Sequence, residues 1–137
     1  MEHSRLLDKS QESKEATDLL AEAGKYHAAT SRAYYAIYQK IIYILECNEQ
    51  EVTRVHGRNI EALRNLLIDK GLFNGSGAAD VANNIRILKE FRKSCDYDKV
   101  FLMDKFCYER NIKPLIMDIN RALNAEVFSR EMRGGSI

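Results

Sequence analysis

An arginine interrupts an otherwise apolar stripe in a segment that we expect to be helical, residues 78–97. With a 4-3-4-3 spacing, the stripe consists of Val81, Ile85, Leu88, Arg92 and Cys95. Because an unpaired guanidinium is very costly to bury, Arg92 must pair with a neighbour or line a cleft. Asp96, four residues on, offers a structural ion pair, whereas the guanidinium fork also suits a phosphate group. The sequence leaves both interpretations open.

A histidine lies on the apolar stripe of the preceding predicted helix, residues 53–70. His56 stands four residues before Ile60 and seven before Leu63, so it is either a hydrogen-bonded core residue or part of a site. Arg54 and Arg58 flank it on an adjacent face. Such a pair is usually solvated, but beside a cleft it would favour phosphate.

A run of aromatic residues gives the third candidate. Arg32 lies three residues before Tyr35, whose ring can cover the arginine stem or accept a cation–π contact. The periodicity favours core packing for Tyr34, Tyr35 and Tyr38.

Other chemistries lack the residues that they need. The chain has no His-Glu-x-x-His and no Glu-x-x-His, so a zinc protease or a di-iron bundle is unsupported. No Gly-x-Ser-x-Gly occurs, and the serine, histidine and aspartate residues are too scattered to indicate a hydrolase. We therefore expect no metal and no cofactor.

The elements that must position these residues are helices. The chain has 137 residues and a single proline, and it is rich in helix-forming residues, which predicts one all-α domain over residues 1–132 and a flexible tail over 133–137. Helices are expected at 4–23, 25–47, 53–70, 78–97 and 99–131, the last with a break near Pro114. The segment 25–47 is apolar on almost every side, which places it in the middle of a bundle.

Three local features refine this outline. The first helix should bury a partly apolar face made of Leu6, Ala16, Leu19, Leu20 and Ala23. Thr53 is the expected N-cap of the third helix, and Gly71 should follow its end. The glycine-rich stretch 71–77 is expected to be a flexible connection.

Composition limits the classes of function. The net charge is +1, so bulk electrostatics do not indicate a DNA-coating protein, and any nucleic-acid role needs a local site. The cysteines, Cys47, Cys95 and Cys107, are odd in number and suggest reduced thiols in a cytoplasmic protein. The N-terminus does not look like a signal peptide, and the longest apolar stretch, 33–45, is too short to cross a bilayer. We expect no membrane association.

Three segments together resemble the prokaryotic HEPN (higher eukaryotes and prokaryotes nucleotide-binding) domains. The stretch 23–38, Ala-Gly-Lys-Tyr-His-Ala-Ala-Thr-Ser-Arg-Ala-Tyr-Tyr-Ala-Ile-Tyr, resembles the signature second helix of that family. His56-Gly57 resembles a segment that opens the third helix, and the stretch 92–97 resembles the family's Arg-x-x-x-Asp-Tyr. The resemblance covers roughly residues 5–130.

The resemblance implies an up-and-down bundle of four to five helices, usually a homodimer with a cleft near the dimer interface. Many members are toxins or abortive-infection effectors that cleave RNA without a metal. Others bind nucleotides or regulate partners, and are often encoded beside a small nucleotidyltransferase. The ribonuclease branches carry Arg followed four to six residues later by His. This chain has no histidine after His56 and carries Asp96-Tyr97 instead.

Three hypotheses follow. The first is a module of a toxin–antitoxin or phage-defence system that binds nucleotide or RNA and acts as a partner or regulator. Its candidate binding residues are Arg32, Tyr35, Arg54, His56, Arg58, Arg92, Asp96 and Tyr97. The second is a metal-independent ribonuclease toxin with Arg92 and His56 as catalytic residues, since an ionised Asp96 cannot donate a proton. The third is a helical interaction domain in which Arg92, Asp96 and Tyr97 only stabilise the bundle.

Overall fold

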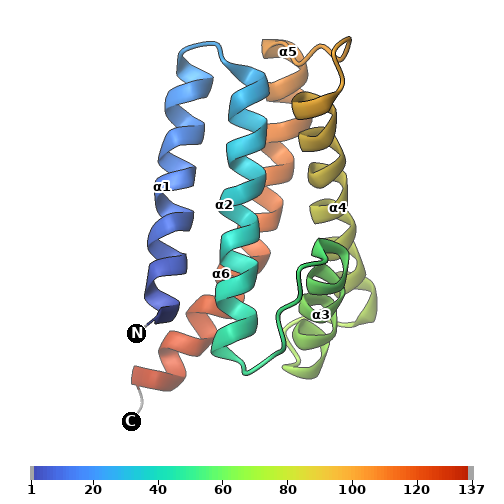
Figure 1. The fold of residues 1–137 in the computed structure, drawn as a ribbon. Coiled ribbons are helices and arrows are strands. Elements are labelled where there is room, and N and C mark those ends of the chain that lie inside the picture. The colour runs from blue at the N-terminus through green and yellow to red at the C-terminus, as the bar shows by residue number, and fades with distance from the viewer. Residues whose placement is uncertain (1, 136–137) are drawn as a thin grey trace.

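The long helices α1 (Glu2–Glu22), α2 (Tyr26–Cys47), α4 (Gly75–Tyr97) and α6 (Lys113–Gly135) run up and down side by side (Figure 1). The shorter α3 (His56–Asp69) lies between α2 and α4 in the chain, and α5 (Lys105–Cys107) with the π-helical turn η1 (Tyr108–Ile112) leads into α6. This computed structural model describes the backbone of residues 2–135 and the side chains of residues 5–126. No strand occurs in that part of the chain, so the predicted all-α bundle is confirmed.

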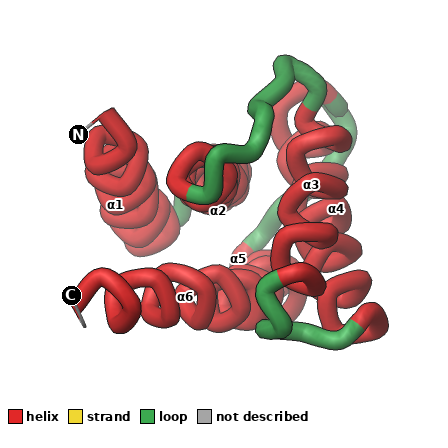
Figure 2. The backbone as a smooth tube through the Cα atoms, turned by 90° about the horizontal axis from the view of Figure 1, so that it is seen from below, coloured by secondary structure: helices red, strands yellow, loops and turns green. Residues whose placement is uncertain are grey.

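Helix α2 occupies the centre of the bundle, as its apolar composition predicts. It contacts α1, α3, α4, α6 and η1, and Figure 2 shows α1 on one side of it and the α3–α4 pair on the other. The fully buried side chains of Ile37, Ile41, Ile44 and Leu45 line its length. A helix with neighbours on most of its sides needs an apolar surface on most of them, because buried polar groups would lose their hydration, and Arg32 of α2 is accordingly exposed.

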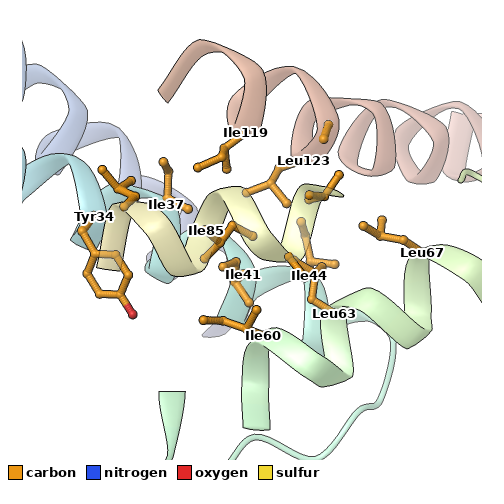
Figure 3. Packing of buried hydrophobic residues seen from close by; sticks show 14 of the residues in the cluster. Tyr34, Ile37, Ile41, Ile44, Ile60, Leu63, Leu67, Ile85, Ile119 and Leu123 are labelled. Atoms are coloured by element: carbon orange, nitrogen blue, oxygen red, sulfur yellow. The ribbon is translucent and has the colours of Figure 1, made fainter. Parts of the chain in front are cut away.

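The core is mainly aliphatic and ends in an aromatic residue. Ile60 and Leu63 of α3, Ile85 of α4 and Ile119 of α6 meet the α2 side chains. Figure 3 shows Tyr34 at one end of this cluster, with its hydroxyl pointing away from the aliphatic side chains. The core therefore leads directly into the polar residues beyond Tyr34.

The apolar face predicted for α1 is only partly correct: Leu20 packs against the core and Leu6 and Ala16 are half-buried, but the helix packs largely through hydroxyl groups. The buried side chains of α1 include Ser10, Ser13 and Thr17, whereas Leu19, expected on the packed face, is 67% exposed. The Ser10 hydroxyl donates to the Ala36 carbonyl at 2.6 Å, and the Ser13 hydroxyl and the Gln39 amide form a hydrogen bond of 3.0 Å. Small hydroxylated side chains let the two helices approach closely while every buried hydroxyl keeps a partner.

Two predicted helix starts are also corrected. The N-cap of α3 is Val55, and Thr53 instead accepts a hydrogen bond from the Val55 amide with its side-chain oxygen. Helix α4 begins at Gly75, within the stretch 71–77 that was expected to be a flexible connection. The Asn74 side chain caps α4 by accepting from the Gly77 amide at 2.7 Å, and this asparagine cap allows the helix to start among glycines.

The end of the chain differs from the predicted helix 99–131 at its start, because residues 99–104 are not helical and α5 begins at Lys105. The break expected near Pro114 is the π-helical turn η1, which ends just before the proline and widens the coil ahead of a residue that has no amide donor. Helix α6 continues to Gly135, so the predicted tail 133–137 is helical in its first three residues, and residues 136–137 lie outside the described part. Among the described residues, no helix has the length and apolar character that a membrane crossing requires.

Replacing Leu63 by alanine should lower the free energy of unfolding by about 2–5 kcal/mol, because a fully buried side chain would leave a cavity. The matched control is Ile68→Ala on the same helix, where the side chain is 36% exposed and the loss should stay under about 1 kcal/mol. Equilibrium urea denaturation measures both values. Equal losses in the two variants would contradict the packing of α3 described above.

Candidate functional site

Two stripes of side chains face each other where α2 packs against α4. On α2 the stripe is Ser31, Tyr34, Tyr35 and Tyr38, and on α4 it is Lys89, Arg92, Lys93 and Asp96. Each set has the spacing i, i+3, i+4 and i+7, which keeps its members on one helix face. The helices run in opposite directions (Figure 1), so the early residue Ser31 donates to the late residue Asp96 at 3.2 Å.

The guanidinium of Arg92 is buried in the middle of this contact. Arg92 is only 6% exposed, and its Cζ atom lies 5.1 Å from the ring centroid of Tyr34 and 5.5 Å from that of Tyr35. Its Nη1 atom lies 3.6 Å from the Asp96 carboxylate, so the predicted ion pair exists but is longer than a hydrogen bond. The Nε atom of Arg92 is buried and has no hydrogen-bond partner among the described residues.

Tyr34 connects this arginine to His56. The Tyr34 hydroxyl lies 2.7 Å from His56 Nδ1. The imidazole also lies flat on the Tyr38 ring, with centroids 3.9 Å apart and planes 18° apart. Arg92 and His56, which are 36 positions apart in the sequence, therefore both contact Tyr34 within one subunit.

Asn59 of α3 fixes the positions of Tyr38 and of the segment before α3 by hydrogen bonds. Asn59 is fully buried; its Nδ2 donates to the Tyr38 hydroxyl at 2.7 Å and to the Thr53 carbonyl at 2.9 Å. Its Oδ1 accepts from the Thr53 amide at 2.9 Å. One side chain thus ties the segment before α3 to the aromatic face of α2, and places His56 where α3 begins.

Burial and nearby positive charges keep the imidazole of His56 neutral, and burial keeps the phenol of Tyr34 neutral. Burial is the largest cause that lowers the pKa of His56, followed by the charges of Lys89, Arg92 and Lys93. Burial strongly raises the pKa of Tyr34, and it outweighs the opposite effect of Arg92. At neutral pH the imidazole and the phenol are therefore uncharged, and the positive charge belongs to the α4 side chains.

The predicted site residues divide into three groups. Arg92, Asp96, Tyr35 and His56 belong to the cluster around Tyr34. Arg32 is exposed at its edge, with its Cζ atom 5.9 Å from the Tyr35 ring centroid. Arg54, Arg58 and Tyr97 are exposed, and no described contact joins them to Arg92.

Several participants were missed in the sequence. Tyr34 and Tyr38 were interpreted as core residues, which is correct for the buried Tyr34, whereas Tyr38 is only half-buried at the edge of the core; both also make hydrogen bonds that this interpretation left out. Lys89 and Lys93 could have been found from their helical spacing to Arg92. Asn59 carried no signal, because its partners come from a different helix and an irregular segment. Within the described side chains, no group of three or more His, Cys, Asp or Glu could hold a metal ion.

These features define a helical bundle with an aromatic and basic site between α2, α3 and α4. A family model described as HEPN domain matches residues 3–127, and the chain belongs to the HEPN domain family. The comparisons with curated proteins and with solved structures find no match.

The hydrogen bonds by which Asn59 joins Thr53 to Tyr38, here called the Asn59 clamp, can be tested by Asn59→Ala. This variant should lose at least about 2 kcal/mol of unfolding free energy, because it leaves buried partners on Thr53 and Tyr38 unsatisfied. The Thr53 amide should also exchange its hydrogen much faster. Asn65→Ala, an exposed position on the same helix, is the control and should change stability by less than about 0.5 kcal/mol. An unchanged exchange rate at Thr53 in Asn59→Ala would disprove the clamp.

The lowered pKa of His56 predicts a pH dependence of stability. The fold favours the neutral imidazole, so its contribution is present above the unfolded-state pKa of about 6.5 and is lost as the pH falls through the lower folded-state pKa. The unfolding free energy of the wild type should therefore drop more between about pH 7.5 and about pH 5.5 than that of His56→Gln. Urea denaturation at both pH values measures the difference. The same drop in the two proteins would show that His56 does not titrate as described.

Proposed function

We propose that this HEPN domain binds RNA or a nucleotide by accepting a phosphate group at Arg92, and that it does so without cleaving the ligand. The observation that carries the proposal is the state of the Arg92 guanidinium. It is buried, its single carboxylate contact is 3.6 Å long, and its Nε has no partner among the described residues. Besides Asp96, the Tyr34 hydroxyl contacts the guanidinium, and a fork of five donors with these described partners still has donors for a bidentate phosphate.

The surroundings of Arg92 support an anionic ligand. Lys89 and Lys93 lie on the same face of α4, and both lower the pKa of His56. Helix α3 begins at His56, its N-cap makes no side-chain hydrogen bond, and its first turn contains no acidic residue. The amide groups and the dipole at this helix start favour negative charge. Arg54 and Arg58 extend the basic character of this end of α3.

The position expected to carry the histidine in ribonucleases of this family supports binding over cleavage. Here it is taken by Asp96, which accepts from Ser31 and pairs with Arg92, and by Tyr97, which is 75% exposed. Neither side chain supplies the imidazole expected of the ribonuclease branches. Cleavage is the second candidate function, because a neutral His56 beside the Tyr34 hydroxyl could accept a proton from a 2′-hydroxyl.

The biological setting that we propose is a toxin–antitoxin or phage-defence system. In it the domain, as a homodimer, would act as a partner or regulator of a nucleotidyltransferase-type protein. Family membership is what supports this part of the proposal. A pure interaction domain remains the alternative that binding measurements address first.

The double variant Lys89→Ala/Lys93→Ala should weaken binding of a short single-stranded RNA and reduce the slope of log Kd against log salt by about 1.4, since two phosphate contacts are lost. The control is Lys105→Ala/Lys113→Ala, two exposed lysines on α5 and α6, which should leave the slope unchanged. Fluorescence anisotropy at several salt concentrations measures both. No affinity of the wild type at low salt would refute the proposed function and favour the interaction domain. Cleavage of the RNA in EDTA would favour the ribonuclease.

A further inference from the structure

The imidazole of His56 has one face and one edge occupied. Tyr38 covers one face at a centroid distance of 3.9 Å, and the Nδ1 edge is bonded to the Tyr34 hydroxyl at 2.7 Å. The residue is nevertheless only half-buried. Among the described residues, no ring contact or hydrogen bond is made by the opposite face of the ring or by its Nε2 edge, which leaves an aromatic surface beside the cationic side chains of α4.

The orientation of this ring is set by the protein and needs no ligand. Tyr38 is held by the Asn59 amide at 2.7 Å, and Tyr34 is fully buried in the core. The rings of Tyr34 and Tyr38 are stacked with their planes 17° apart, and both lie within 18° of the imidazole plane. A flat surface that is fixed in advance loses little conformational entropy when a ligand covers it.

We infer that the open face of His56 is a stacking platform for an unpaired nucleobase, and that the ligand of this site is therefore single-stranded. This inference rests on the proposed function, because the phosphate of the same ligand would lie at Arg92. Every base has an aromatic face, so a platform of this kind accepts bases without reading their sequence. Bases in a duplex are already stacked and cannot reach it.

The spacing fits a base and its adjoining phosphate. The Tyr34 ring centroid lies 5.9 Å from that of His56 and 5.1 Å from Arg92 Cζ. The platform and the guanidinium thus lie against the same tyrosine side chain, which is close enough for one ligand to place a base on His56 and its adjoining phosphate at Arg92. Since the imidazole is neutral, its contribution is contact with the base, and the charge that meets the phosphate comes from Arg92, Lys89 and Lys93.

The test compares two single-stranded oligoribonucleotides of equal length and charge, one with adenine bases and one with abasic sites. Fluorescence anisotropy at fixed low salt gives Kd for the wild type, for His56→Ala and for His56→Phe, with circular dichroism to confirm that each variant folds. The wild type should bind the adenine strand about tenfold or more tightly than the abasic strand. His56→Ala should lose that preference, and His56→Phe, which keeps an aromatic face, should retain it.

The outcomes separate the platform from the phosphate site. Equal affinity of the wild type for the two strands, with binding that still depends on salt and on Lys89 and Lys93, would overturn the platform and leave the proposed function standing. Binding of neither strand would overturn both. A preference for adenine that survives in a folded His56→Ala would place the base elsewhere and would also overturn the inference. An RNA duplex of the same sequence should gain nothing over the abasic strand.

Discussion

Burying one positive charge is the constraint on which this site depends. Arg92 lies in a stripe that otherwise builds the core, and water cannot solvate a guanidinium that is only 6% exposed. The neighbouring helix must compensate it, and α2 does so with the faces of Tyr34 and Tyr35. Asp96 adds a carboxylate and is itself held by Ser31. The contact between α2 and α4 is therefore organised around a charge as well as around apolar side chains.

The same constraint links the core to the site through Tyr34. Its ring closes one end of the aliphatic cluster, while its hydroxyl reaches His56 (Figure 3). Because the residue serves both purposes, a change at Tyr34 or Arg92 would alter packing and ligand contacts together. Lys89 and Lys93 on α4 can be changed without opening the core. Substitutions of these two lysines therefore test the proposed ligand binding more cleanly than a substitution of Arg92, which would also disturb the core.

Much of the fold could be predicted because helix periodicity and burial are local properties. The apolar character of the stretch 25–47 correctly placed α2 at the centre, and the spacing of the α4 stripe correctly placed Arg92 inside. Helix α1 was misjudged because its packed face depends on how closely Ser10 approaches Ala36, which apolar periodicity does not report. Asn59 was missed for a related reason: its side chain bonds to Thr53 in the irregular segment before α3 and to Tyr38 on α2, and helix periodicity reports neither contact.

The position of the Asp96 carboxylate affects how the candidate site would bind an anion. Its carboxylate is 28% exposed and lies at the rim of the arginine, whose own side chain is 7% exposed, so an approaching phosphate meets Asp96 before it reaches Arg92. Repulsion between the Asp96 carboxylate and a phosphate would have to be offset by Lys89 and Lys93. Unlike Arg92, neither lysine is paired with Asp96 among the described contacts. The nearest carboxylate to Lys93 is Glu90 at 3.8 Å, a pair exposed on both sides and therefore weak. In the proposed binding mode, the lysines would attract the ligand, and the balance between Arg92 and Asp96 would set how firmly its phosphate is held. A histidine in place of Asp96 would remove that competition, which is consistent with the difference between this chain and the ribonuclease branches that it resembles.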